Sequence, residues 1–229
     1  MRTYQLWLKQ ITKLGLVLMM GVSMNADAGL FGFSGDSWKE EVLLHDGSKI
    51  IVERSQSYGG RHEITQSPPI KEYNISFTLP NSGKTIKWTS EYSEDVGRAN
   101  LHPLALHILN GTPYIVAAPT GCLSYNKWGR PNPPYVIFKH YGKEWQRITL
   151  QELPVEFKDL NLVNNTKDHA EHLVDSSVVA ADAIKQLNSS LTQPEFKTIL
   201  REPLANEWCA NWKLNSFKAP LPMKPSSEK

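Results

Sequence analysis

The segment YNISFTL, residues 73–79, alternates apolar and polar side chains without a break. A period of two predicts a β-strand with one face in the core and the other in water. The turn residues of 80–83 follow, and Ile86 and Trp88 continue the inward face on a return strand. The stretch therefore predicts an antiparallel hairpin, the unit from which we expect the fold to be built.

Three further turn signals, each between two apolar runs, occur at Asp46-Gly47, Asn110-Gly111 and 141–143. Glycine suits these positions because it accepts the positive φ that tight hairpin turns require. Four hairpins give about eight strands, too few for a propeller of four-stranded blades. The sequence therefore predicts an antiparallel β-sandwich or an open barrel.

Beyond the β-rich part the period changes, because apolar side chains over 170–187 recur at helical spacing. The pattern predicts one long helix, which Asn165 or Thr166 can cap. A second, shorter helix is predicted to start at Thr192, which forms a capping box with Glu195. Strands first and helices second give the fold class α+β.

The first 28 residues have the three zones of a secretory signal. Arg2, Lys9 and Lys13 precede a short apolar run, and the small residues of 26–28 place cleavage before Gly29. The run is shorter than the roughly 20 residues of a membrane-spanning helix, and an uncleaved anchor is the alternative. We therefore expect a periplasmic or secreted protein with no transmembrane anchor after cleavage.

The chain divides by composition into a signal peptide at 1–28, a β-rich domain at 29–160, a helical segment at 161–217 and a disordered tail at 218–229. The net charge of the whole chain is +2. Because the signal peptide holds three cations and one acid, the remaining chain is close to neutral. Such a charge gives no reason to expect a nucleic-acid partner.

Cys122 and Cys209 are the two cysteines of the chain. In an oxidising compartment two lone cysteines most simply pair with each other. The bridge would close a loop of about 88 residues and contribute about 4 to 5 kcal/mol by chain entropy. A free buried thiol and a catalytic cysteine are the alternatives.

The segment 124–135 is the most unusual stretch, since three prolines stiffen a run that carries aromatic and cationic side chains. Rigid loops of this composition grip sugars, peptides or aromatic ligands in many binding modules. We therefore predict that Tyr125, Trp128 and Arg130 bind a ligand, with Trp128 and Arg130 on an exposed rim. The alternative is a connection whose Trp128 plugs one end of the core.

Two histidine patterns suggest metal sites but match none of the common motifs. His169 and His172 are three residues apart near the start of the predicted long helix, so a shared metal ion competes with a solvated polar face. Residues 62–66 begin like a zinc-hydrolase helix but have Gln66 where the second histidine belongs. We expect neither a metal nor another cofactor.

Three segments together, Trp38–Gly47, Tyr125–Pro131 and Tyr135–Phe138, resemble a group of exported proteins of Gram-negative bacteria. The resemblance covers about residues 38–160. It implies a periplasmic location and carries no activity, cofactor or active-site residue with it.

These observations favour a non-enzymatic exported module that binds an envelope protein or a carbohydrate. The alternative is a hydrolase acting on envelope carbohydrate or peptide, with its acid and base assembled across strands. Because no nucleophile or metal motif supports the hydrolase, the sequence assigns no catalytic residue.

Overall fold

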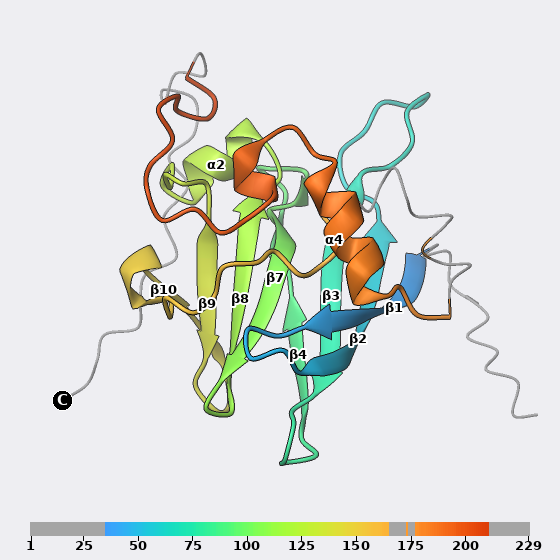
Figure 1. The fold of residues 1–229 in the computed structure, drawn as a ribbon. Coiled ribbons are helices and arrows are strands. Elements are labelled where there is room, and N and C mark those ends of the chain that lie inside the picture. Colours follow the sequence, from blue (N-terminus) through green and yellow to red (C-terminus); the bar gives the residue numbers. More distant parts are fainter. Residues whose placement is uncertain (1–34, 165–172, 174–176, 211–229) are drawn as a thin grey trace, which may run out of the picture. The chain divides into compact units, whose positions relative to one another are not determined.

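The computed structural model describes residues 35–164, 173 and 177–210 (Figure 1). Within these residues the strands are β1 (Gly35–Leu43), β2 (Lys49–Tyr58), β3 (Ile70–Thr78), β4 (Thr85–Thr89), β5 (Tyr92–Ser93), β6 (Arg98–Ala99), β7 (Leu101–Leu109), β8 (Thr112–Pro119), β9 (Val136–His140) and β10 (Trp145–Ile148). The described helices are α2 (Cys122–Lys127) and α4 (Ala181–Ser189), with 3₁₀ turns at η1 (Leu150–Glu152) and η2 (Pro194–Phe196).

The strands form two four-stranded antiparallel sheets, the first sheet (β1-β2-β3-β4) and the second sheet (β7-β8-β9-β10). All four predicted hairpins are present, because each predicted strand pairs with its neighbour in sequence. Gly47, Gly83, Gly111 and Gly142 have the positive φ that their turns require. The predicted α+β class and antiparallel sandwich are confirmed. The sequence does not predict the small β5–β6 pair, because its two-residue strands are too short to show a period.

The inner faces of the two sheets share one apolar core. In β3, Ile75 and Phe77 are buried, and they lie opposite Trp88 and Ile86 of β4. The second sheet contributes side chains such as Ile115 to the same cluster. Complete burial of a side chain of this size contributes roughly 1.5–3 kcal/mol, so the alternation fixes which way each strand faces.

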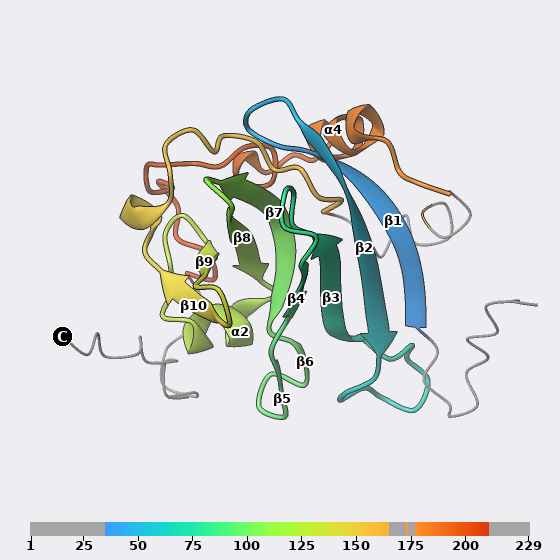
Figure 2. The ribbon, with the colours of Figure 1, turned by 90° about the horizontal axis from the view of Figure 1, so that it is seen from below.

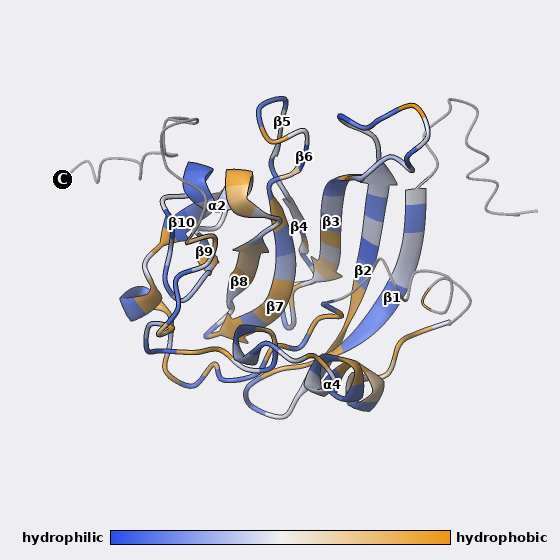
Figure 3. Ribbon diagram, turned by 90° about the horizontal axis from the view of Figure 1, so that it is seen from above, coloured by the Kyte–Doolittle hydropathy of each residue, from blue (hydrophilic) through white to orange (hydrophobic). Residues whose placement is uncertain are grey.

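The outer faces of the two sheets differ. β1 and β2 alternate buried and exposed side chains, whereas β7 and β8 are buried on both faces. Figure 3 colours the same strands by hydropathy. Residues 150–163 and a segment that we call the C-terminal strap, residues 191–210, cover the second sheet (Figures 1 and 2). The covered cluster comprises Leu104, Ala105, Tyr114, Val116, Ala118, Tyr135, Ile137, Ile148, Leu153, Phe157, Leu160 and Ile199.

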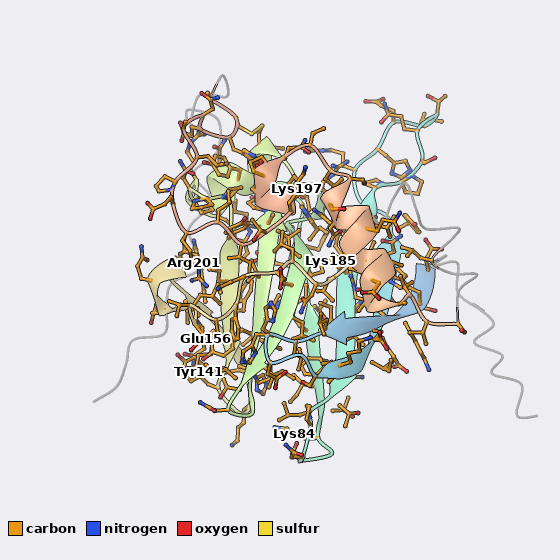
Figure 4. All side chains as sticks on the ribbon, viewed as in Figure 1. Lys84, Tyr141, Glu156, Lys185, Lys197 and Arg201 are labelled. Carbon is orange, nitrogen blue, oxygen red and sulfur yellow. A yellow bond between two sulfur atoms is a disulfide. The ribbon has the colours of Figure 1, made fainter. Side chains whose placement is uncertain are left out.

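Hydrogen bonds to backbone carbonyls hold the strap in place. The guanidinium of Arg201, labelled in Figure 4, donates to the carbonyls of Leu150, Leu153, Pro154 and Phe157. The buried hydroxyl of Tyr135 lies 2.9 Å from the carbonyl oxygen of Glu195 and accepts from the N–H of Leu200 at 3.3 Å. These bonds satisfy polar groups that the cover would otherwise bury without partners.

The long helix predicted over 170–187 is not continuous. Val179 pairs with β1 in a parallel bridge, its N–H donating to Lys39 and its carbonyl accepting from Glu41, both at 2.8 Å. These backbone groups are then committed to a sheet edge and cannot serve a helix. The helix α4 accordingly begins at Ala181.

The capping box predicted at Thr192 is also absent. Pro194 begins a single 3₁₀ turn without a side-chain cap, and the Glu195 carboxylate accepts instead from the Trp208 indole at 2.8 Å. A contact between two distant parts of the strap has therefore replaced the predicted one between Thr192 and Glu195.

Several predicted features lie outside the described residues. They are the signal peptide at 1–28, the helix caps Asn165 and Thr166, and the tail at 218–229. Among the described helices, none has the length and apolar character needed to cross a membrane.

Candidate functional site

The segment 124–135 does not form the exposed rim that we expected. Its first part belongs to helix α2, and Tyr125 and Trp128 are only 1% and 3% exposed. The predicted exposure of Trp128 is therefore wrong. Burying the two large rings in the core removes more apolar surface from water than an exposed loop would, and this burial is favourable. The buried rings are then not available to a ligand.

Trp128 plugs one end of the core, as in the alternative considered above. Its ring meets Phe138 edge to face at 5.9 Å between centroids, and Arg147 lies over it at 5.4 Å. A small cavity of about 240 Å³ lies beside it, walled also by Trp88 and Trp145. Within the described part of the chain, the buried Trp128 indole Nε1 has no hydrogen-bond partner.

Arg130 binds the strap rather than facing solvent. Its Nε donates to the Glu207 carboxylate at 2.7 Å, its Nη2 donates to the carbonyls of Trp208 and Cys209 at 3.3 Å, and the guanidinium lies over the Tyr125 ring. The Glu207 hydrogen bond raises the pKa of Arg130. The contacts that the structure gives Arg130 are thus internal ones.

The predicted disulfide is confirmed. Cys122 and Cys209 are bonded; their Cα atoms lie 5.6 Å apart and the two residues are 87 positions apart in sequence. This result excludes the free thiol and the catalytic cysteine. The bridge ties the strap to the start of α2, next to the Arg130 contacts.

A larger cavity, of about 1100 Å³, is lined by residues of the loop 59–69, of neighbouring ends of both sheets and of the strap. Its wall includes aromatic and cationic side chains: Tyr58, Tyr73, Phe196, Trp208, Arg61 and Arg98. Because the supporting elements are strands and a disulfide-bonded strap, we take this cavity as the candidate functional site.

Two glycines bring the rim of this cavity together. The Arg61 N–H donates to the Gly97 carbonyl at 3.0 Å, which holds the loop 59–69 against the turn between β5 and β6. A Cβ added at Gly60 would lie 2.4 Å from that carbonyl oxygen, so only glycine permits the approach. The contact brings Arg98, which follows Gly97, to the same rim as Arg61.

The deeper wall of the cavity is neutral. His102 of β7 packs its ring against Phe196 of the strap at 5.8 Å between centroids. Burial lowers the pKa of His102 to about 4, a hydrogen bond with Asn164 opposes the shift, and the charge of Arg54 adds to it. His102 is therefore uncharged at neutral pH.

Tyr58 contributes a neutral hydroxyl at the end of β2. It donates to the Asp36 carboxylate, and the Gln56 amide donates to both groups at 2.7 and 3.1 Å. Burial, followed by the Asp36 hydrogen bond, raises the pKa of Tyr58 to about 12. Tyr58 thus keeps its proton at neutral pH and does not serve as a base.

The titratable groups give little support to metal or acid–base chemistry. His62 lines the cavity from the loop 59–69, not from a helix, and its Nδ1 lies 2.8 Å from the Gly60 carbonyl oxygen. The described residues contain no cluster of three or more metal-ligating side chains. His169 and His172 lie outside the described residues. The described lining of the cavity includes neither Asp nor Glu.

The sequence does not identify this cavity. Its members come from the first sheet, the loop 59–69, the second sheet and the strap, which are far apart in the chain. The one local signal is a Gly-Arg dipeptide that occurs three times, of which Gly60-Arg61 and Gly97-Arg98 contribute to the cavity and Gly129-Arg130 does not. That signal gains meaning only from the contact that brings the two dipeptides together.

Comparison of the chain with protein-family models, curated proteins and solved structures gave no match. The functional argument therefore depends on the geometry and charge of the cavity.

Proposed function

We propose that the protein is a non-enzymatic binding module, exported to the periplasm or secreted, whose ligand occupies the cavity of about 1100 Å³. The cavity carries this proposal because ligand pockets are typically concave, largely apolar and about 300–1,000 Å³ in volume. Its size and its combination of aromatic walls with polar and cationic side chains fit a small molecule.

Hydrolysis of carbohydrate or peptide is less well supported. Such chemistry needs an acid and a base facing the substrate. Of the two histidines in the described lining, His102 is neutral and packed against Phe196, and those lining residues offer His62 no carboxylate as a partner. Binding is therefore the function that we propose.

Export is supported by the composition of residues 1–28 and by a disulfide that suits an oxidising compartment. We expect cleavage after Ala28, so the intact mass of the protein from the periplasmic fraction or medium should correspond to a chain beginning at Gly29. Recovery of the protein in the membrane fraction with Met1 retained would contradict export as a cleaved protein.

Filling the cavity should abolish ligand binding. Ser67, on the loop 59–69, and Gln193, on the strap, are exposed residues that line the cavity, so S67W and Q193W together should occupy the space without disturbing the core. The uncharged dye N-phenyl-1-naphthylamine, which fluoresces in apolar sites, measures the effect. We expect the double variant to weaken dye binding at least tenfold.

A matched variant, T85W, adds an indole to the exposed face of β4, away from the cavity. It should leave dye affinity within twofold of the wild type. Equal affinity of all three proteins would contradict the proposed site.

A further inference from the structure

The rim of the large cavity carries two fixed cations. Arg61 lies on the loop 59–69 and Arg98 begins β6, and the hydrogen bond from Arg61 to Gly97 holds the two segments together. Guanidinium groups stay protonated at any physiological pH. Two like charges at one rim repel each other, so an anion bound between them would be favoured.

Nearby carboxylates do not neutralise these arginines. The Asp95 carboxylate pairs with Lys127 at 3.3 Å, and only its backbone carbonyl meets Arg61, at 3.4 Å. The Asp36 carboxylate is hydrogen-bonded by side chains of β2. Arg98 pairs with Ser93 through its backbone, but within the described part of the chain its side chain makes neither a hydrogen bond nor an ion pair. Both positive charges therefore remain available to a ligand.

Charge and apolar surface are separated along the cavity. Among the lining residues, Arg61 and Arg98 are exposed, whereas Ala99 and Tyr73 are buried and His102 is neutral. A ligand that matched this arrangement would place its charge at the rim and an apolar body inside. Burying charge against the deeper wall would cost free energy without a partner to offset it.

Building on the binding function proposed above, we infer that the ligand is a small amphipathic anion. Its carboxylate, sulfonate or phosphate group binds between Arg61 and Arg98, and its apolar body lies against Phe196 and Trp208. Arginine suits this task because its planar donors match the oxygens of such anions two at a time.

Two dyes that share a ring system separate charge from apolar contact. 8-Anilino-1-naphthalenesulfonate carries a sulfonate, and N-phenyl-1-naphthylamine does not. We expect the wild-type protein to bind the sulfonate at least tenfold more tightly. The double variant R61Q/R98Q should lose at least tenfold in affinity for the sulfonate, since charge-assisted hydrogen bonds of this kind typically change binding by about tenfold or more. Its affinity for the neutral dye should stay within twofold.

The matched control is K84Q/K143Q, which removes two charges from exposed turns away from the cavity, where Figure 4 labels Lys84. It should bind both dyes like the wild type. Unchanged sulfonate affinity in R61Q/R98Q, or equal loss of both dyes, would overturn the anionic ligand while leaving the cavity as a binding site. Failure of the wild-type protein to bind either dye would instead overturn the proposed function.

Competition then distinguishes the sources of such an anion. Displacement of the sulfonate dye by decanoate would indicate a lipid-derived ligand, and displacement by naphthalene-2-sulfonate would indicate a ring-bearing one. Failure of both to displace the dye would contradict the amphipathic class.

Discussion

The two sheets have the same number of strands and the same antiparallel order, yet they bury different numbers of faces. In β1 and β2 every second side chain is exposed or half-buried, whereas β8 is buried from Pro113 to Pro119. The strand sequences reflect this difference, since an alternating pattern suits one buried face and a continuous apolar run suits two. The cavity lies at the seam where the doubly covered sheet meets the singly covered one.

The cover on the second sheet depends on long-range contacts. The strap is joined to α2 by the disulfide, to residues 150–157 by Arg201, and to β9 through the nearby hydroxyl of Tyr135. None of these partners is close in sequence. The first sheet needs no such ties, because its outer face is polar enough to remain in water.

Removing the same side chain from the two outer faces is the most direct test of this comparison. Ile137 lies on β9 under the cover and is 2% exposed, whereas Ile51 lies on β2 and is 48% exposed. We expect I137A to lower the free energy of unfolding by about 3 kcal/mol, because it leaves a cavity in a packed cluster. I51A should change it by less than about 0.5 kcal/mol.

Urea unfolding of both variants gives the two values, and an unchanged m-value would show that the unfolded state is unaffected. Similar losses in the two variants would mean that the outer faces are equally covered in solution.

The sequence was sufficient for the fold wherever neighbouring residues decide the structure. The alternation in 73–79 and the glycine-containing turns predict the hairpins, because strand pairing there depends on local period and turn chemistry. The helix over 170–187 fails at Val179, where a bond to β1 replaces the helical one. The error arises because the spacing of apolar residues within one segment carries no information on which other strand that segment will pair with.

Local sequence patterns could not predict the candidate site. The composition of 124–135 correctly marks an unusual segment, but it cannot show that Trp128 turns inward toward Phe138 or that Arg130 meets the strap. Arg61 and Arg98 are likewise unremarkable until two glycines bring them together. Sites assembled from distant segments depend on tertiary contacts that one sequence does not display.

Histidines give a second contrast between the sheets. Within the described residues, the histidines with lowered pKa lie on the second sheet, and His102 and His107 have values of about 4. His107 is stacked on Phe157 at 4.6 Å between centroids, and its Nε2 lies 2.9 Å from the Asp159 carbonyl oxygen. We therefore expect the loss of stability at acidic pH to arise mainly from the second sheet.

We expect this acid effect to be smaller than the loss of stability in I137A. Burial lowers the pKa of His107, the Asp159 carbonyl opposes the shift, and the charge of His45 adds to it. The unfolded chain, with a histidine pKa near 6.5, takes up the proton first, so stability falls as pH drops from about 6.5 toward 4. Between pH 7 and pH 5 we expect His107 to account for a loss on the order of 2 kcal/mol.

H107Q tests this expectation. The fall in its free energy of unfolding between pH 7 and pH 5 should be smaller than that of the wild type by about 2 kcal/mol, whatever its stability at pH 7. H62Q, at an exposed loop position, should show the same fall as the wild type. A slope that H107Q does not alter would show that His107 keeps its ordinary pKa and that the cover does not exclude water from it.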